Sequence, residues 1–127
     1  MVNALFNQPT YVAGKKLLDV ADMRQTAIAA NLANLETPNY RRVDITPTFA
    51  TELDQALKGA NSGQIASLQP KVAVDLTATA ANRDGNTVQL ENELMAMGQN
   101  TLAHNFETQL ISGQLLQLRL AITGRSA

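Results

Sequence analysis

The side chains in this sequence that could perform acid–base or nucleophilic chemistry are few and isolated. The chain has one histidine, His104, and no cysteine. A histidine alone on a predicted helix is far more often a packing or hydrogen-bonding residue than a base, and it lacks the further ligands that a zinc site needs. Glu91 and Glu93 suit the start of a helix, where the dipole favours carboxylates. We therefore expect no enzyme activity, no metal ion and no cofactor.

Other motifs for catalysis or nucleic-acid binding are also missing. No serine lies in a Gly-x-Ser-x-Gly elbow, and no glycine-rich phosphate loop occurs. Tyr40 beside Arg41 and Arg42 could stack on a base, but such neighbours are common in turns. With 10 basic and 11 acidic residues the net charge is −1, so no overall field draws the chain to nucleic acid. We expect no nucleic-acid partner.

The composition favours a small helical protein. The 127 residues allow one compact domain, and 45% of them are hydrophobic but only 4% aromatic. Leucine, alanine, isoleucine, valine and methionine suit helix–helix packing. No apolar run approaches the roughly 20 residues that span a bilayer, and the N-terminus lacks the pattern of a cleaved secretory signal. We expect no direct membrane span.

The first region, residues 1–36, is predicted to be the N-terminal helix of the fold. Pro9 suits a first helical position, and Pro38 should end the helix beyond residue 35. A seam of alternating four- and three-residue steps contains two polar residues, which can fix register and partner choice. Its members are Leu17, Ala21, Arg24, Ile28, Asn31 and Leu35.

The middle region, residues 37–85, is predicted to be irregular. Thr37–Tyr40 forms a turn, in which Pro38 presets one dihedral angle and Asn39 tolerates a left-handed conformation. Residues 49–58 predict a short helix that Gly59 ends, and 60–69 predict a loop. Alternation over 72–76 suggests a short strand.

The last region, residues 86–127, predicts a long C-terminal helix. Asn86 is expected to cap it, with Gln89 at capping-box spacing and Gly124 as its stop. About 36 residues at 1.5 Å each would make a rod of roughly 55 Å. An average helix has only about 11 or 12 residues, so this length needs a reason.

Apolar residues surround much of this predicted helix. One line of residues comprises Leu90, Leu94, Met97, Thr101, His104, Thr108, Ile111, Leu115, Leu118 and Ile122. A second line comprises Met95, Gly98, Leu102, Phe106, Gln109, Gly113, Leu116 and Leu120. The N-terminal helix could cover the first line as an antiparallel, coiled-coil-like partner and leave the second for another molecule. The alternative is the central helix of a monomeric bundle.

The N-terminal region resembles the signature of the flagellar rod and hook proteins. In that family a helix carries an Asn-x-Ala-Asn core and ends in a Thr-Pro-Gly-aromatic turn. The matching residues here are Asn31, Ala33, Asn34, Thr37, Pro38 and Tyr40. Asn39 stands where glycine is usual, and asparagine also tolerates positive φ. Residues 84–95 and 118–124 resemble the two ends of the C-terminal helix in the short proximal rod subunits.

The resemblance implies a structural rod subunit of the bacterial flagellar basal body. It implies type III export without a cleaved signal, a place in the periplasmic rod above the MS ring, and other rod proteins, the MS-ring protein and export-gate components as neighbours. We expect Asn31, Asn34 and the Thr37–Tyr40 turn to set how the terminal helices meet. The null hypothesis is that they only end a helix.

The residues expected at the assembly interface are apolar residues and glycines of both terminal helices. They are Leu17, Ala21, Ile28, Leu94, Met97, Gly98, Leu102, Phe106, Ile111, Gly113, Leu115, Leu116, Leu118, Leu120 and Ile122. Two other functions remain open at this point. The chain could be another axial or needle-like subunit of a secretion apparatus, or a monomeric helical binding module or chaperone.

Overall fold

The computed structural model describes residue 4 and residues 6–124. Two long helices flank a middle region of short elements, so the predicted mainly helical fold is confirmed. In chain order the elements are α2 (Pro9–Ala33), β1 (Val43–Ile45), α3 (Thr48–Lys58), α4 (Ser62–Ser67), β2 (Val72–Val74) and α5 (Leu90–Thr123).

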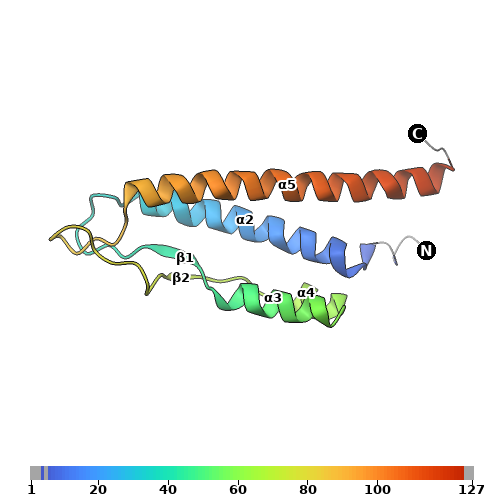
Figure 1. Cartoon of the computed structure of the whole chain (residues 1–127), viewed down its shortest axis with the longest axis horizontal. Helices are drawn as coiled ribbons and strands as arrows, with labels where there is room; N and C mark the ends of the chain where they lie inside the picture. The colour runs from blue at the N-terminus through green and yellow to red at the C-terminus, as the bar shows by residue number, and fades with distance from the viewer. Residues whose placement is uncertain (1–3, 5, 125–127) are drawn as a thin grey trace.

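Helix α2 lies between α5 on one side and the β1–β2 pair with α3 and α4 on the other (Figure 1). The two long helices run antiparallel, because Asn31 near the end of α2 bonds to Glu93 near the start of α5, while Gly14 faces Ile111. The buried apolar cluster comprises Ala13, Phe49, Leu53, Ala56 and Ile65. This cluster lies between α2 and the short helices, and further buried apolar residues of the long helices, such as Ile28 and Ala96, lie outside it.

Helix α2 begins as predicted, with Pro9 in its first turn. It ends at Ala33, slightly earlier than the predicted end at residue 35. The side-chain amide of Asn34 folds back to donate to the carbonyl of Ala30, at 2.8 Å. This bond satisfies one of the carbonyls that a helix leaves free at its C-terminus.

The short helices of the middle region were only partly predicted. Helix α3 is confirmed over Thr48–Lys58. The predicted loop at 60–69 is wrong, because this stretch contains α4. The Asn61 side chain accepts a hydrogen bond from Gln64 N at 3.0 Å and so caps α4, and Ile65 is fully buried. The burial of one apolar side chain, together with a side-chain cap, is enough to order this short helix.

Strands β1 and β2 form an antiparallel pair in which Val43 lies opposite Val74 and Ile45 opposite Val72. The predicted strand at 72–76 is confirmed for 72–74, whereas Leu76 lies beyond the strand and is exposed. Strand β1 was not predicted, because three residues are too few to show a two-residue period.

Helix α5 has 34 residues, which corresponds to about 51 Å at 1.5 Å per residue. Gly124 ends it as predicted, in the left-handed region at φ 63°, and its N–H bonds to Leu120 O at 3.0 Å. The predicted cap is wrong: Gln89 precedes the helix, and Asn86 has another role. Within residues 6–124 no helix is long and apolar enough to cross a membrane.

Candidate assembly surface

The face of α5 that packs on α2 is more polar than the predicted first line. Its fully buried members are Glu93, Ala96 and Asn100. Half-buried residues continue this face along the helix, and these are Met97, His104, Glu107, Ile111, Gln114 and Leu118. Only part of the predicted first line is thus covered by α2. The line's other apolar residues, Leu90, Leu94, Leu115 and Ile122, are exposed, which corrects the expectation that α2 would cover them all.

Hydrogen bonds explain why polar residues are accepted between the two long helices. The Asn100 amide donates to the backbone carbonyl of Ala21 at 2.9 Å and to the side chain of Gln25 at 3.2 Å. His104 lies 3.6 Å from Asp22. Glu107 is different, since its Oε2 is buried without a partner among the described residues. Burial raises the pKa of Glu107 above its ordinary value, and the nearby His104 opposes that rise.

The opposite face of α5 is the predicted second line, and it carries large apolar residues in solvent. Leu102 is 72% exposed and Phe106 is 63% exposed. Met95 and Leu116 are also exposed, whereas Leu120 is half-buried. We call the residues Met95, Leu102, Phe106, Leu110 and Leu116 the outer apolar face.

Two glycines lie along the same side of α5 as this face. A Cβ atom built on Gly98 or Gly113 would meet no described residue within 4 Å, so contacts within residues 6–124 do not require a glycine at either position. A glycine costs about 1 kcal/mol relative to alanine in a helix interior. Their presence is consistent with a close approach from another molecule.

A buried ionic junction joins the middle region to α5. The Arg42 guanidinium contacts Asp44 at 3.0 Å and Asp75 at 2.8 Å, and it also donates to Glu93, whose side chain is fully buried. Burial acts to lower the pKa of Arg42, but its bonds to Glu93 and Asp44 outweigh burial and raise it. Arg24 of α2 adds a second cation, with its Nε 3.2 Å from Asp44. The junction therefore connects both long helices to the strand pair.

Asn31 is the neutral centre of this junction. Its side-chain amide donates to Val43 O and accepts from Val43 N, both at 2.9 Å, so it pairs with β1 as a neighbouring strand would. The same amide donates to Glu93 at 3.2 Å, and its oxygen accepts from the Tyr40 hydroxyl at 3.4 Å. These contacts support the expectation that Asn31 sets how the terminal helices meet.

The turn after α2 is held by Asn86 rather than by its own residues alone. The Asn86 amide donates to the carbonyls of Asn34, Leu35 and Thr37 at 2.8, 3.0 and 2.8 Å. Asn86 is 3% exposed and thus closes the C-terminus of α2 from the segment before α5. Because its side-chain amide is engaged by the end of α2, Asn86 does not cap α5 as predicted.

Asn39 and Gly85 make a second contact between these segments. Asn39 has the predicted positive φ, at 60°, and its N–H donates to Asp84 O at 2.9 Å. Gly85 has φ 76°, and a Cβ there would lie 2.6 Å from Asn39 Oδ1. Only glycine fits this approach. Ala33 and Pro38 are exposed. Thr37 is exposed as well, but its carbonyl accepts from Asn86 at 2.8 Å and its hydroxyl donates to Asn34 Oδ1 at 3.2 Å.

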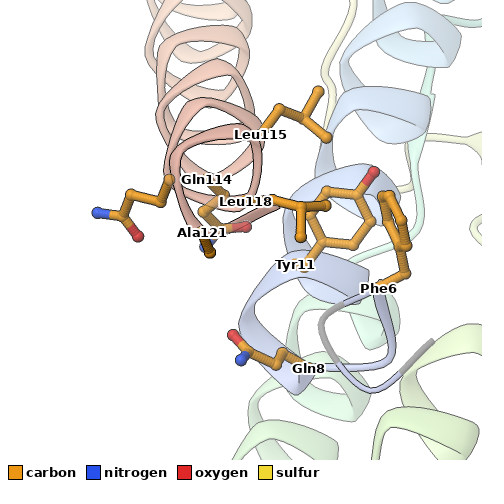
Figure 2. A pocket seen from close by; sticks show the side chains of 8 residues that line it. Phe6, Gln8, Tyr11, Gln114, Leu115, Leu118 and Ala121 are labelled. Carbon is orange, nitrogen blue, oxygen red and sulfur yellow. The ribbon is translucent and has the colours of Figure 1, made fainter. Parts of the chain in front are cut away.

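A groove lies where the start of α2 meets the last turns of α5. Figure 2 shows the rings of Phe6 and Tyr11 facing Leu115 and Leu118 of α5. The groove has a volume of about 270 Å³, and the two rings pack edge to face with centroids 5.5 Å apart. The groove lies on the α2 side of α5 and contains no residue of the outer apolar face.

The predicted interface residues fall into three groups. Leu17, Ala21 and Ile28 lie inside the chain, where Ala21 and Ile28 are buried and Leu17 packs against the core. Met97, Ile111 and Leu118 are half-buried on the α2 side. The rest lie on the surface of α5, except the half-buried Leu120; they are Leu94, Gly98, Leu102, Phe106, Gly113, Leu115, Leu116 and Ile122.

Sequence reasoning missed most of the junction. Glu93 was attributed to the helix dipole and Arg42 to a short basic cluster. A signal did exist for Glu93, because it recurs at seven-residue spacing with Asn100, Glu107 and Gln114 on one helix face. No comparable signal marks Asp44 or Asp75, which reach Arg42 only through the strand pairing.

No protein-family model matches the chain. Among curated proteins it is similar to the flagellar basal body rod protein FlgB of Escherichia coli (strain K12), with 30% identity over 117 residues that cover 80% of this chain and 83% of that protein. It is 28% identical to FlgB of Borreliella burgdorferi over 113 residues, covering 75% and 82%, and 26% identical to FlgB of Bacillus subtilis (strain 168) over 120 residues, covering 84% and 88%. The resemblance inferred from the motifs is confirmed. The chain belongs to the family of flagellar basal body rod proteins FlgB.

Proposed function

We propose that this rod subunit joins its neighbours through the outer apolar face of α5. The observation that carries the proposal is the distribution of side chains on this helix: the polar Glu93 and Asn100 are buried against α2, whereas large apolar side chains such as Leu102 and Phe106 are exposed to solvent. Contiguous exposed apolar surface of this kind marks interaction sites in proteins. A rod transmits torque, and closely packed helices resist shear because many contacts must break together.

The neighbours in this proposal are further copies of the chain and other rod proteins. The MS-ring protein and export-gate components are the proposed contacts at the base of the rod, and export proceeds without a cleaved signal peptide. No catalytic role is proposed. What supports a structural role is that the relatives are named as flagellar basal body rod proteins.

The test replaces Phe106 by aspartate in the bacterium that carries this chain. A charge at the centre of an apolar interface should abolish rod assembly, because it would be buried without a partner. The isolated chain should remain as helical as before, since Phe106 is already exposed. Swimming and electron micrographs of basal bodies are the readouts.

Thr51→Asp is the matched control, because Thr51 is exposed on α3, on the other side of α2 from α5. It should leave swimming unchanged. Normal rods with Phe106→Asp would overturn the assignment of the interface. Normal rods in a strain that lacks the chain entirely would overturn the role in the rod itself.

A further inference from the structure

Strand β2 has one edge whose backbone groups form no hydrogen bond with any residue of the range 6–124. Thr46 N donates to Lys71 O at 2.9 Å and Asp75 N donates to Arg42 O at 2.8 Å. In an antiparallel pair the backbone groups of successive residues point alternately toward and away from the partner strand. Lys71, Ala73 and Asp75 therefore point toward β1, whereas Val72 and Val74 point away from it.

The outer edge of β1 shows the same alternation but is closed. The N–H and carbonyl of Val43 point away from β2, and both are bonded to the side chain of Asn31. This leaves the outer edge of β2 as the free edge of the pair.

The free edge is accessible to another molecule. No residue in the described part of the chain hydrogen-bonds to the outward backbone groups of Val72 and Val74. Each of these side chains is 42% exposed, and Ala73 between them is exposed as well. A flat edge of small β-formers is a template for another strand.

The edge is complementary to itself. When two copies of β2 pair antiparallel about Ala73, the outward groups of Val72 in one copy meet those of Val74 in the other. Both hydrogen-bonding pairs are then complete. Lys71, which is exposed, comes opposite Asp75 of the second copy at each end. We propose that the free chain forms a two-fold symmetric dimer through β2, with a continuous sheet in the order β1, β2, β2 and β1.

If the chain assembles into a rod as proposed above, the β2 dimer and the rod exclude each other. Two-fold contacts close on themselves, whereas an open helical rod requires head-to-tail contacts between different patches. Two copies paired through β2 point in opposite directions, so they cannot both be incorporated as a pair into one polar rod. The pairing therefore belongs to chains that have not yet been assembled.

The dimer is weak and must be trapped to be measured. A pairing of three to five residues buries far less than the roughly 1,200 Å² of stable interfaces. The chain has no cysteine, so one introduced thiol gives an unambiguous cross-link. In Ala73→Cys the two thiols face each other across the symmetry axis. They belong to a non-hydrogen-bonded pair, whose Cα atoms are about 4.5 Å apart. This distance is within the range for disulfides.

The experiment oxidises the purified full chain carrying Ala73→Cys and measures the dimer on a non-reducing gel over a range of concentrations. Ala50→Cys, exposed on α3, is the control for random collisions. We expect Ala73→Cys to give at least about fivefold more dimer. Adding Lys71→Glu should return it to the control level, because glutamate would lie opposite Asp75, whereas adding Arg41→Glu should not.

Equal cross-linking of Ala73→Cys and Ala50→Cys would overturn the proposal. So would cross-linking that Lys71→Glu leaves unchanged, because it would come from another geometry. Both results are measured on the purified chain without rods, so they test the dimer independently of the proposed function. Circular dichroism of each variant shows whether the fold is intact. If Ala73→Cys is not folded, Val74→Cys mixed with Val72→Cys tests the same register, since these two residues face each other across the dimer.

Discussion

At the scale of single residues, the junction around Arg42 and Asn31 combines costly and favourable contacts. Burying charges costs several kcal/mol per ion, and pairing returns that energy only when every lone pair finds a donor. Each carboxylate oxygen of Glu93 has one donor here: Oε1 accepts from Arg42 and Oε2 accepts from Asn31. The contacts bridge α2, β1 and α5, so their geometry fixes how these elements are oriented. A merely apolar contact would leave that orientation less defined.

The junction predicts different roles for two acids in the first turns of α5. Glu93→Ala should lower the free energy of unfolding by about 3 kcal/mol, because it leaves a buried cation short of a partner. Glu91→Ala should cost less than about 0.5 kcal/mol, since Glu91 is exposed and only its interaction with the helix dipole is lost. Urea unfolding followed by circular dichroism measures both.

Glu91 is the internal control for the helix dipole, because both acids lie in the first turn. If the two variants are equally destabilised, the dipole explains Glu93 and the junction contributes nothing. If both are neutral, the chain does not need either carboxylate for folding.

Glu107 predicts a pH dependence of stability. Burial raises the pKa of Glu107 in the folded chain, so the folded state holds this proton more tightly than the unfolded state does. Its contribution to stability is therefore present at low pH and falls as the pH rises from the ordinary glutamate range through the raised value. Glu107→Gln should remove this loss, so the urea concentration at the unfolding midpoint should be higher in the variant than in the parent at pH values above the ordinary glutamate range.

The measurement is the urea midpoint of both chains between pH 4 and pH 7. The difference between variant and parent should grow over this interval and then level off. A constant difference would mean that the Glu107 carboxyl titrates alike in the folded and unfolded states.

At the scale of elements, local signals were sufficient wherever one residue decides the backbone. Pro9, Asn39 and Gly124 were assigned correctly from the sequence, because each acts on its own dihedral angles. Asn86 was misassigned, because its partners lie about 50 residues away at the end of α2. Capping boxes describe the following helix only, and nothing in the local sequence distinguishes a cap for another helix.

The face of α5 that packs on α2 was predicted wrongly for a similar reason, because polar residues occupy part of it. The rule that apolar residues face the partner helix placed the first line against α2. That rule assumes that each helix satisfies itself within the monomer. In α5, Glu93 and Asn100 lie on the inner face because they have hydrogen-bond partners there, and apolar residues such as Leu102 and Phe106 are left exposed.

Gly113 separates the stability of this element from its role in assembly. Gly113→Ala should stabilise the isolated chain by about 1 kcal/mol, because alanine is the better helix former and nothing surrounds the position. In the rod the added methyl group should hold neighbouring backbones apart and reduce swimming. Thermal unfolding should therefore show a more stable chain, whereas motility assays should show reduced swimming. A more stable chain with normal swimming would mean that no neighbour approaches Gly113.

At the scale of the whole molecule, the core is on one side of α2 and α5 is on the other. Among the described residues, no buried or half-buried hydrophobic side chain of α5 packs against the cluster of Ala13, Phe49, Leu53, Ala56 and Ile65. The first half of α5 is held by the junction and by Asn100, whereas its last turns meet the start of α2. Local stability in a protein follows such contacts. The far end of α5 is therefore the part of the molecule that most needs a neighbour.

This gradient predicts an order of hydrogen exchange along α5. In the isolated chain, backbone amides of residues 112–123 should exchange at least about tenfold faster than those of residues 97–104, which is a difference of about 1.4 kcal/mol in opening free energy. In isolated basal bodies the same amides should become protected, because neighbouring copies cover the outer apolar face. Uniform protection of α5 in the isolated chain would show that the helix is stable without neighbours, and the exposed face would then lose its explanation as an assembly surface.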